Sequence, residues 1–437
     1  MMWFVILYNF LIYFCGYALI ATMGGIKNNL IYTFYLSLCN IYCFITPLYF
    51  YFNERRTIWG SEGVYKGVGV NILDYYEKGL MLYATATLLF IIGYNIFRIK
   101  IGKIHLSNKL YSPKSKAIFV WWLAFMLVLI NLLISGFNPI YVIFGSDTAH
   151  NLFNTKSASN YLRNFSDTII TAIIISYLVG VNRFVLFFIT IISFILFILM
   201  GFRYRIILTI LGFIIVYFYK SSFTIKKVLF TSITILIASY LLLFVTYNRF
   251  ELTRGDFSHI IYNPTDYDVN ILFEQTRGAL ADYTIIKYYD SNLQAKHDYG
   301  ITSLYFIVRA LPRSMFGNFK DNLYPPPAFK VMEQAYGIPK QWGTVGEAIL
   351  HYGYMYIAGG KLFLFISSFL LGFIIKILKK LFSSSDFWHL SITIILCQCL
   401  FQWITRGYFP QTVDHFTYLV IGVIMFRFIT LWKFKLY

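Results

Sequence analysis

The chain has 437 residues, of which 58% are hydrophobic and only 13% are charged. This composition excludes an ordinary soluble domain, and apolar runs of about 18 residues or more, each long enough to cross a bilayer, recur along the chain. The formal net charge of +18 does not require nucleic acid, because many of the lysines flank apolar runs as the positive-inside rule predicts, and we expect no nucleic-acid partner.

Hydropathy predicts an all-α polytopic membrane protein with about eleven transmembrane helices. The first apolar run has no basic segment before it, so we expect a span there rather than a cleavable signal peptide. The five cysteines lie in apolar runs and form no CxxC pair, which argues against a zinc site or a disulfide framework. The predicted spans are 3–23, 30–52, 79–97, 117–135, 165–181, 183–201, 206–219, 228–247, 358–376, 387–405 and 416–432.

Basic residues predict the orientation of these spans. The segment 98–116 is densely basic and has no acid, so it should be cytoplasmic, and the basic segments 220–227, 376–386 and 433–437 then fall on the same side. The loops on the opposite, outer side are 53–78, 136–164 and a large loop at 248–357 that holds most of the polar residues. The predicted organisation is an N-terminal bundle (1–247), this large loop with amphipathic surface helices (248–357), and C-terminal spans (358–437).

Arginine is concentrated on the predicted outer side, where the positive-inside rule disfavours it. The tight turn "GFRYR" places Arg203 and Arg205 at the membrane surface. The guanidinium fork matches phosphate oxygens, so the set as a whole predicts an anionic substrate such as a lipid-linked diphosphate. The alternatives are snorkelling toward ordinary lipid headgroups, and salt bridges to Asp256, Glu274 or Asp282. Six more arginines complete the set: Arg249, Arg254, Arg277, Arg309, Arg313 and Arg406.

The motif "TVGEAILHYG" opens the ninth predicted span and places Glu347 and His351 four residues apart, on one face of a helix. A carboxyl group that is partly removed from water gains a raised pKa and can act as a general base, whereas a helix N-terminus favours its anion. A structural alternative is a T-x-x-E capping box between Thr344 and Glu347, which explains the carboxylate by itself.

Several familiar signatures are missing from the sequence. It contains no P-loop, GxSxG or HExxH motif and no DxD-like loop carboxylate pair, so neither a metal nor a cofactor is expected. Acidic residues are nearly absent from the predicted spans, which argues against an ion-coupled transporter with a proton relay.

The layout and several motifs resemble the bacterial oligosaccharide repeat-unit polymerases, the Wzy-type O-antigen or capsular polysaccharide polymerases. The shared features are about eleven spans, a G-x-R turn between middle spans, and a dominant late outer loop containing "LPRS", "YPPPAF" and "GEAILHYGYMYIAGG". The resemblance covers nearly the whole chain in layout and rests on residues 201–205 and 300–360 in motif. It implies a GT-C-like, metal-independent, inverting glycosyltransferase in the bacterial cytoplasmic (inner) membrane, with its active site facing outward.

The same resemblance implies the substrates and the roles of residues. A sugar hydroxyl of one undecaprenyl-diphosphate-linked oligosaccharide would attack the anomeric carbon of another, and undecaprenyl diphosphate would leave. Glu347 would be the base, with His351 orienting or replacing it, the arginines would stabilise the diphosphate, and Trp342 would stack on a sugar. Candidate partners are membrane lipid, a chain-length regulator protein and a flippase.

Two alternative functions remain open at this point. The related O-antigen ligases carry a histidine at a comparable late-loop position, whereas the glutamate of "GEAILHYG" is closer to the polymerase pattern. A non-enzymatic flippase of lipid-linked oligosaccharides should carry cationic residues inside the bundle, but the polar residues of this chain are concentrated in one outer loop.

Overall fold

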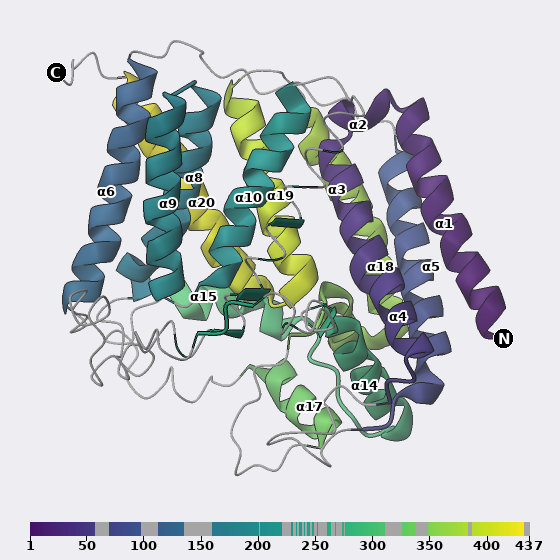
Figure 1. Cartoon of the computed structure of the whole chain (residues 1–437). Coiled ribbons are helices and arrows are strands. Elements are labelled where there is room, and N and C mark those ends of the chain that lie inside the picture. The colour runs from purple at the N-terminus through teal and green to yellow at the C-terminus, as the bar shows by residue number, and fades with distance from the viewer. Residues whose placement is uncertain are drawn as a thin grey trace. The chain divides into compact units, whose positions relative to one another are not determined.

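The computed structural model describes residues 1–56, 70–97, 112–134, 160–200, 202–220, 276–310, 326–337, 348–382 and 387–431, with scattered residues between 229 and 274. Every regular element in these described ranges is helical (Figure 1). Seven helical segments are long and apolar enough to cross a membrane. The chain is therefore an all-α, multi-pass membrane protein, as its composition predicts.

The seven candidate spans coincide with seven of the predicted ones. The second is a composite of α3 (Leu30–Cys39), the π-helical segment η1 (Asn40–Ile45) and α4 (Thr46–Phe52), and the third combines η2 (Leu73–Tyr75) with α5 (Tyr76–Ile96). A short helix, α2 (Gly25–Asn28), separates the first two spans. The other five spans are α1 (Met2–Thr22), α6 (Pro113–Ile134), α18 (His351–Leu381), α19 (Phe387–Arg406) and α20 (Phe409–Leu431).

Helices also occur at three further predicted spans. They are α8 (Asn160–Leu178), α9 (Arg183–Leu199) and α10 (Arg203–Lys220). None of the three is among the seven candidate spans. The apolar parts of α9 and α10 have fewer than 18 residues, and Arg163 and Asp167 lower the mean hydropathy of α8. Most of the predicted span 228–247 lies outside the described residues. The eleven-span topology therefore stays a prediction, and so does the GT-C-like assignment.

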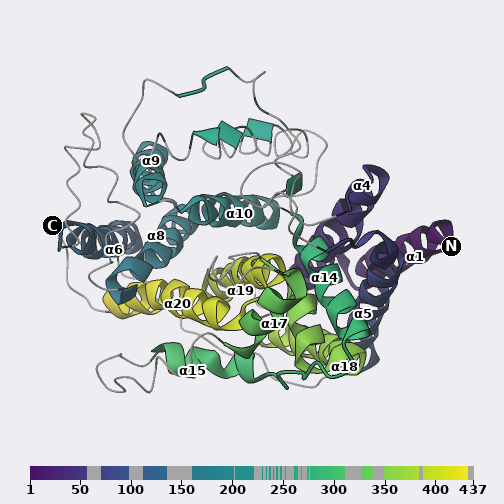
Figure 2. The ribbon, with the colours of Figure 1, turned by 90° about the horizontal axis from the view of Figure 1, so that it is seen from below.

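The large loop contains α14 (Gly278–Ser291), η5 (Ile301–Leu304), α15 (Tyr305–Ala310) and α17 (Pro327–Tyr336). In α17 the buried residues recur at helical spacing on one face, which is the pattern of an amphipathic helix. Helix α14 differs from α17. Its residues from Gly278 to Ile286 are all buried, as in a helix that is covered on every face. Figure 2 shows α14 and α17 beside α18, with which both are in contact.

Contacts divide the chain into two compact units. Unit 1 contains residues 1–104, 273–383 and 399–413, and unit 2 contains residues 105–272, 384–398 and 414–437. The unit boundaries fall inside α19 and α20. The three predicted segments follow the order of the sequence, whereas these units combine regions that are distant along the chain.

Unit 1 is built around a close pairing of α5 with α18, which run side by side in Figure 1. A Cβ atom at Gly93 would collide with the carbonyl oxygen of Phe369, and one at Gly372 would collide with that of Phe90. Only glycine permits the two backbones to approach this closely, which is a common device in membrane helix pairs. The pairing fixes the position of α18, whose first residue is the predicted site residue His351.

Two irregular turns occur in the spans of unit 1. Helix α3 widens into the π-helical segment η1 just before Pro47, whose ring cannot follow a regular α-helical turn. Helix α18 is kinked at Gly359 and Gly360, and Gly360 has a φ of 64°. The kink leaves the Ile357 carbonyl oxygen free to accept a hydrogen bond from the Asp298 backbone N–H at 3.2 Å, which ties the large loop to α18.

Unit 2 contains interhelical hydrogen bonds between apolar surfaces. The hydroxyl groups of Thr168 and Thr171 on α8 donate to the backbone oxygens of Tyr418 and Leu419 on α20, at 2.8 and 2.9 Å. Such bonds stabilise helix pairs where no water competes for the polar groups. They place the first half of α8 against the first half of α20.

Candidate functional site

The turn between α19 and α20 brings several predicted site residues of unit 1 together. Gly407 in this turn has a φ of 64°, a left-handed conformation that favours glycine. A Cβ atom at Gly407 would lie 2.6 Å from the carbonyl oxygen of Ile349 and 2.7 Å from that of Leu350. The turn therefore lies directly against the two residues that precede His351.

Helices of the large loop pack on the same turn through Tyr408. Its ring centroid lies 5.1 Å from that of Phe329 on α17 and 6.0 Å from that of Tyr354 on α18. The guanidinium carbon of Arg309 on α15 lies 5.9 Å from the Tyr408 ring centroid. Arg309 and Arg406 are both exposed. We call Gly407, Tyr408 and the residues packed around this turn the α19–α20 hub. It contains three of the predicted site residues: His351, Arg309 and Arg406.

The His351 side chain is completely buried at the first position of α18. Its Nε2 atom lies 2.9 Å from the Tyr35 hydroxyl, and its ring centroid lies 5.5 Å from that of Trp403 on α19. The Cys39 thiol lies beside the imidazole. Among the described residues, the other ring nitrogen, Nδ1, has no hydrogen-bond partner.

A chain of hydroxyl groups extends from His351 into the bundle. The Tyr35 hydroxyl donates to the Tyr352 hydroxyl at 3.2 Å, and the Tyr352 hydroxyl lies 3.2 Å from Thr87 Oγ1. These residues come from α3, α18 and α5, so the chain joins three helices of unit 1. Each hydroxyl group finds a partner although water is excluded, which is the condition for a stable buried polar network.

Asp282 on α14 supports the start of α18. Its Oδ1 atom accepts a hydrogen bond from the Leu350 backbone N–H at 3.1 Å, and its Oδ2 atom accepts one from the Tyr83 hydroxyl at 2.5 Å. Burial raises the pKa of this carboxyl group, and the hydrogen bonds from Tyr83 and from the Leu350 and Gly353 backbones oppose the rise. A Cβ atom at Gly353 would collide with Oδ1. Among the described residues, Asp282 thus binds the helix terminus and the tyrosine, and it pairs with no arginine.

We expect Asp282→Ala to destabilise the protein by about 2–4 kcal/mol, because it removes a helix cap and leaves two buried donors without an acceptor. Unfolding by SDS in mixed micelles measures this free energy. The matched control is Asp290→Ala on the same helix, which removes a partly exposed ion pair with Lys78 and a contact with the partly exposed Tyr75 side chain, and it should cost at most about 1 kcal/mol. Equal losses for the two variants would contradict the capping role.

The salt-bridge alternative is confirmed for one of the arginines. Arg277 Nη1 donates to Glu274 Oε2 at 2.9 Å, and Arg55 Nη1 lies 3.4 Å from the other oxygen of the same carboxylate. Both pairs are about a quarter exposed, so each contributes little to stability. Their effect is to hold Glu274 and Arg277, just before α14, beside Arg55 in the segment that follows α4.

In unit 2 the "GFRYR" turn leads into a buried charged cluster. Arg205 Nε donates to Asp167 Oδ1 at 2.7 Å, and the side chains of both residues are at most 7% exposed. His415 Nδ1 lies 2.6 Å from Asp167 Oδ2, although the ring is not well directed for a hydrogen bond, so we treat the contact as electrostatic. The salt bridge engages Arg205 through Nε, and no other hydrogen bond of its guanidinium occurs among the described residues.

Arg163 is a member of this cluster that the sequence reasoning did not single out. The guanidinium carbons of Arg163 and Arg205 lie over the Phe202 ring, at 4.5 and 3.8 Å from its centroid. The cluster therefore combines two arginines and a histidine with the carboxylate of Asp167. The sequence does contain a signal, because Arg163 lies at the end of the predicted outer loop 136–164, but no motif distinguishes it from other arginines.

The remaining predicted residues are not placed in a site by the structure. Arg203 is the first residue of α10, and its side chain is not described. Five others lie outside the described residues: Glu347, Trp342, Arg249, Arg254 and Arg313. The predicted capping box of Thr344 and Glu347, and the prediction that Glu347 and His351 share one helix face, are wrong for α18, because this helix begins at His351 with Leu350 as its N-cap residue.

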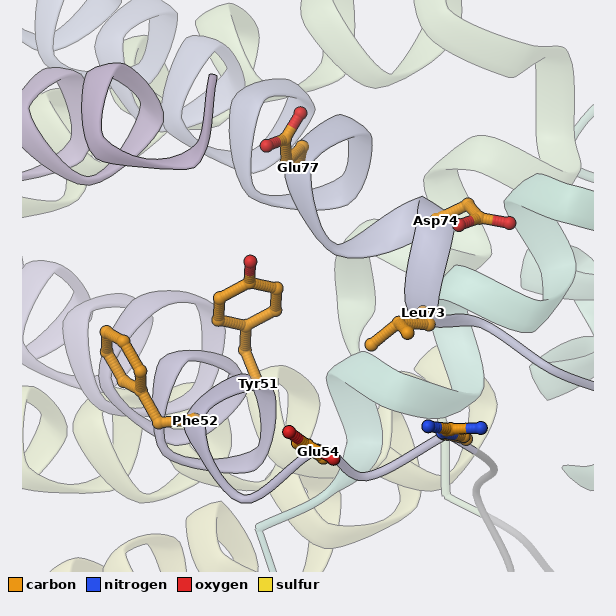
Figure 3. Close-up of a pocket in the computed structure, with 7 residues that line it drawn as sticks. Tyr51, Phe52, Glu54, Leu73, Asp74 and Glu77 are labelled. Carbon is orange, nitrogen blue, oxygen red and sulfur yellow. The ribbon is translucent and has the colours of Figure 1, made fainter.

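A cavity of about 590 Å³ opens between the end of α4 and the start of α5 in unit 1 (Figure 3). It contains none of the predicted site residues. Its charged groups are three carboxylates and one guanidinium, so its net negative charge disfavours an anion such as a diphosphate. The lining residues are Tyr51, Phe52, Glu54, Arg56, Leu73, Asp74 and Glu77.

Comparisons with known proteins give no relative: no family model, no curated protein and no solved structure matches the chain.

Proposed function

We propose that the protein is an oligosaccharide repeat-unit polymerase of the cytoplasmic membrane. It would join undecaprenyl-diphosphate-linked oligosaccharides at the outer face, by metal-independent inverting glycosyl transfer. The observation that carries the proposal is the α19–α20 hub, which contains two exposed arginines and a buried histidine whose Nδ1 has no hydrogen-bond partner among the described residues. Glycosyl transfer from a lipid diphosphate requires both a proton acceptor and cations for the leaving group.

The division of roles follows from the chemistry of these groups. The acceptor hydroxyl must lose its proton as it attacks the anomeric carbon, and an unprotonated imidazole nitrogen of His351 can take it. The leaving diphosphate gains negative charge as its bond to the sugar breaks, and exposed guanidinium groups such as those of Arg309 and Arg406 can donate to its oxygens. Arg203 and Arg205 stay in the proposal as further diphosphate ligands, and Glu347 as a second candidate base.

The surface glycan of a deletion strain tests the proposed function. For a polymerase we expect single repeat units on the lipid carrier or on the acceptor core, with the ladder of longer chains lost and restored by the plasmid-borne gene. Long polymer that accumulates on undecaprenyl diphosphate, with none transferred to the core, would identify a ligase instead. Single lipid-linked units retained on the cytoplasmic face would identify a flippase and would remove the catalytic role of the hub.

A further inference from the structure

The hydroxyl chain beside His351 determines which ring nitrogen carries the proton. A tyrosine hydroxyl has one proton to donate, and the geometry at the two oxygens makes Tyr35 the donor to Tyr352, at 3.2 Å. Tyr35 then has no proton left for its 2.9 Å contact with His351 Nε2. In that contact the imidazole must be the donor, so the neutral ring carries its proton on Nε2.

The opposite tautomer would break this pattern. If Nε2 were unprotonated, Tyr35 would have to give its proton to His351. Tyr352 would then have to donate to Tyr35, which is the direction that the geometry at the two oxygens disfavours. With Nε2 protonated, all three contacts along the chain are satisfied in favourable directions, because Tyr352 is then free to donate to Thr87 Oγ1 at 3.2 Å. A buried network whose hydrogen bonds are all well directed is favoured over one with a poorly directed bond.

The other nitrogen is therefore a proton acceptor. His351 is completely buried, and Nδ1 has no hydrogen-bond partner among the described residues. A buried polar atom without a partner is rare in folded proteins and calls for an explanation such as a ligand or a proton that arrives during function. The neighbouring Cys39 thiol is only a weak donor, so it does not supply a strong partner.

We infer that Tyr35 is a positioning residue that fixes His351 as the Nε2-protonated tautomer and so keeps Nδ1 available as a base. The use of that base rests on the proposed function. In the transfer step, the acceptor hydroxyl proton passes to Nδ1 while its oxygen forms the bond to the anomeric carbon. The bond from that carbon to the diphosphate oxygen breaks, and its electron pair leaves with the lipid diphosphate. The groups that cover His351 must move for the acceptor to reach Nδ1.

The tautomer is measurable without a substrate. The full chain, with ¹⁵N-labelled histidine rings, is reconstituted in lipid nanodiscs, and ¹⁵N chemical shifts report which nitrogen of each neutral ring is protonated. The His351 signals are assigned by their loss in His351→Gln. We expect a single Nε2-protonated form in the wild type and a mixture of both tautomers in Tyr35→Phe, because the phenylalanine no longer accepts the Nε2 proton.

Two controls make the test specific. Tyr32→Phe removes a buried hydroxyl one turn earlier on α3, which donates to the Gly16 carbonyl oxygen at 3.3 Å, and it should leave the His351 tautomer unchanged. Cys39→Ala should also leave it unchanged, which excludes the thiol as the controlling group. An Nδ1-protonated ring in the wild type, or an unchanged tautomer in Tyr35→Phe, would overturn the inference.

The glycan ladder separates this inference from the proposed function. We expect Tyr35→Phe to show loss of the long chains while Tyr32→Phe keeps them. If the deletion strain shows a function other than polymerisation, the ¹⁵N result still decides the tautomer, and only its use in glycosyl transfer fails. If polymerisation is established but the long chains survive in Tyr35→Phe, the positioning role is wrong.

Discussion

Replacing His351 by glutamine is expected to reduce glycan polymerisation by about 10²–10⁴-fold, the usual contribution of a general base. Glutamine has a similar reach and keeps an amide donor toward Tyr35, but it has no basic nitrogen. The measurement is the surface glycan ladder of a deletion strain that expresses the variant, compared at equal amounts of membrane-inserted protein. The expected pattern is single repeat units with no long chains.

A second histidine provides the control for this variant. His297 also lies in unit 1, and its Nδ1 atom is 3.1 Å from the Ile357 carbonyl oxygen at the kink of α18. His297→Gln keeps a donor at that position and is expected to keep the ladder. A normal ladder in His351→Gln would show that the buried histidine is structural and would leave Glu347 as the candidate base; Glu347→Gln in the same assay would then decide between them.

Breaking the buried ion pair of unit 2 is expected to have the largest effect on stability. Asp167→Ala leaves the Arg205 guanidinium without a counter-charge in a buried environment, and loss of one partner of such a pair typically costs about 3–5 kcal/mol. The free energy of unfolding in SDS-containing mixed micelles measures the loss. A change below about 1 kcal/mol would mean that water reaches the pair, as it does at exposed salt bridges.

A double variant separates the structural role of Arg205 from its proposed role in binding diphosphate. Asp167→Asn combined with Arg205→Met removes both charges while keeping similar volumes, and such replacements are often neutral in stability or even stabilising. We expect this variant to recover folded protein but not the ladder, because methionine cannot bind phosphate oxygens. Recovery of the ladder as well would show that Arg205 serves only to neutralise Asp167.

Much of the fold follows from the sequence because spanning a membrane imposes length and hydropathy on each helix separately. The seven candidate spans agree with seven predicted ones, and their limits differ by a few residues at most positions. The largest differences are at the starts of α18 and α20, each seven residues before the predicted limit; α18 begins at His351 instead of near residue 358. Its early start depends on Asp282, which lies 68 residues earlier than Leu350 in the chain and whose contribution no local pattern reveals.

The site was only partly predictable, because its contacts join residues that are distant in the chain. The sequence singled out His351 from its spacing and the arginines from their side of the membrane, and those are properties of one segment at a time. It did not reveal that Arg277 pairs with Glu274 while Arg205 pairs with Asp167, because each arginine had several acids within its possible reach. It also gave no reason to connect Tyr35 with a histidine 316 positions later in the chain.

That this is a helical, multi-pass membrane protein follows from the sequence alone, because hydropathy and helix length are local properties and the bilayer makes both of them essential. Which polar groups meet inside the protein depends on its tertiary structure. The close pairing of α5 with α18 through Gly93 and Gly372 and the burial of α14 bring Tyr35, His351 and Asp282 into one region. These contacts join segments from 68 to 316 residues apart, and they depend on the packing of whole helices, which no single stretch of the chain encodes.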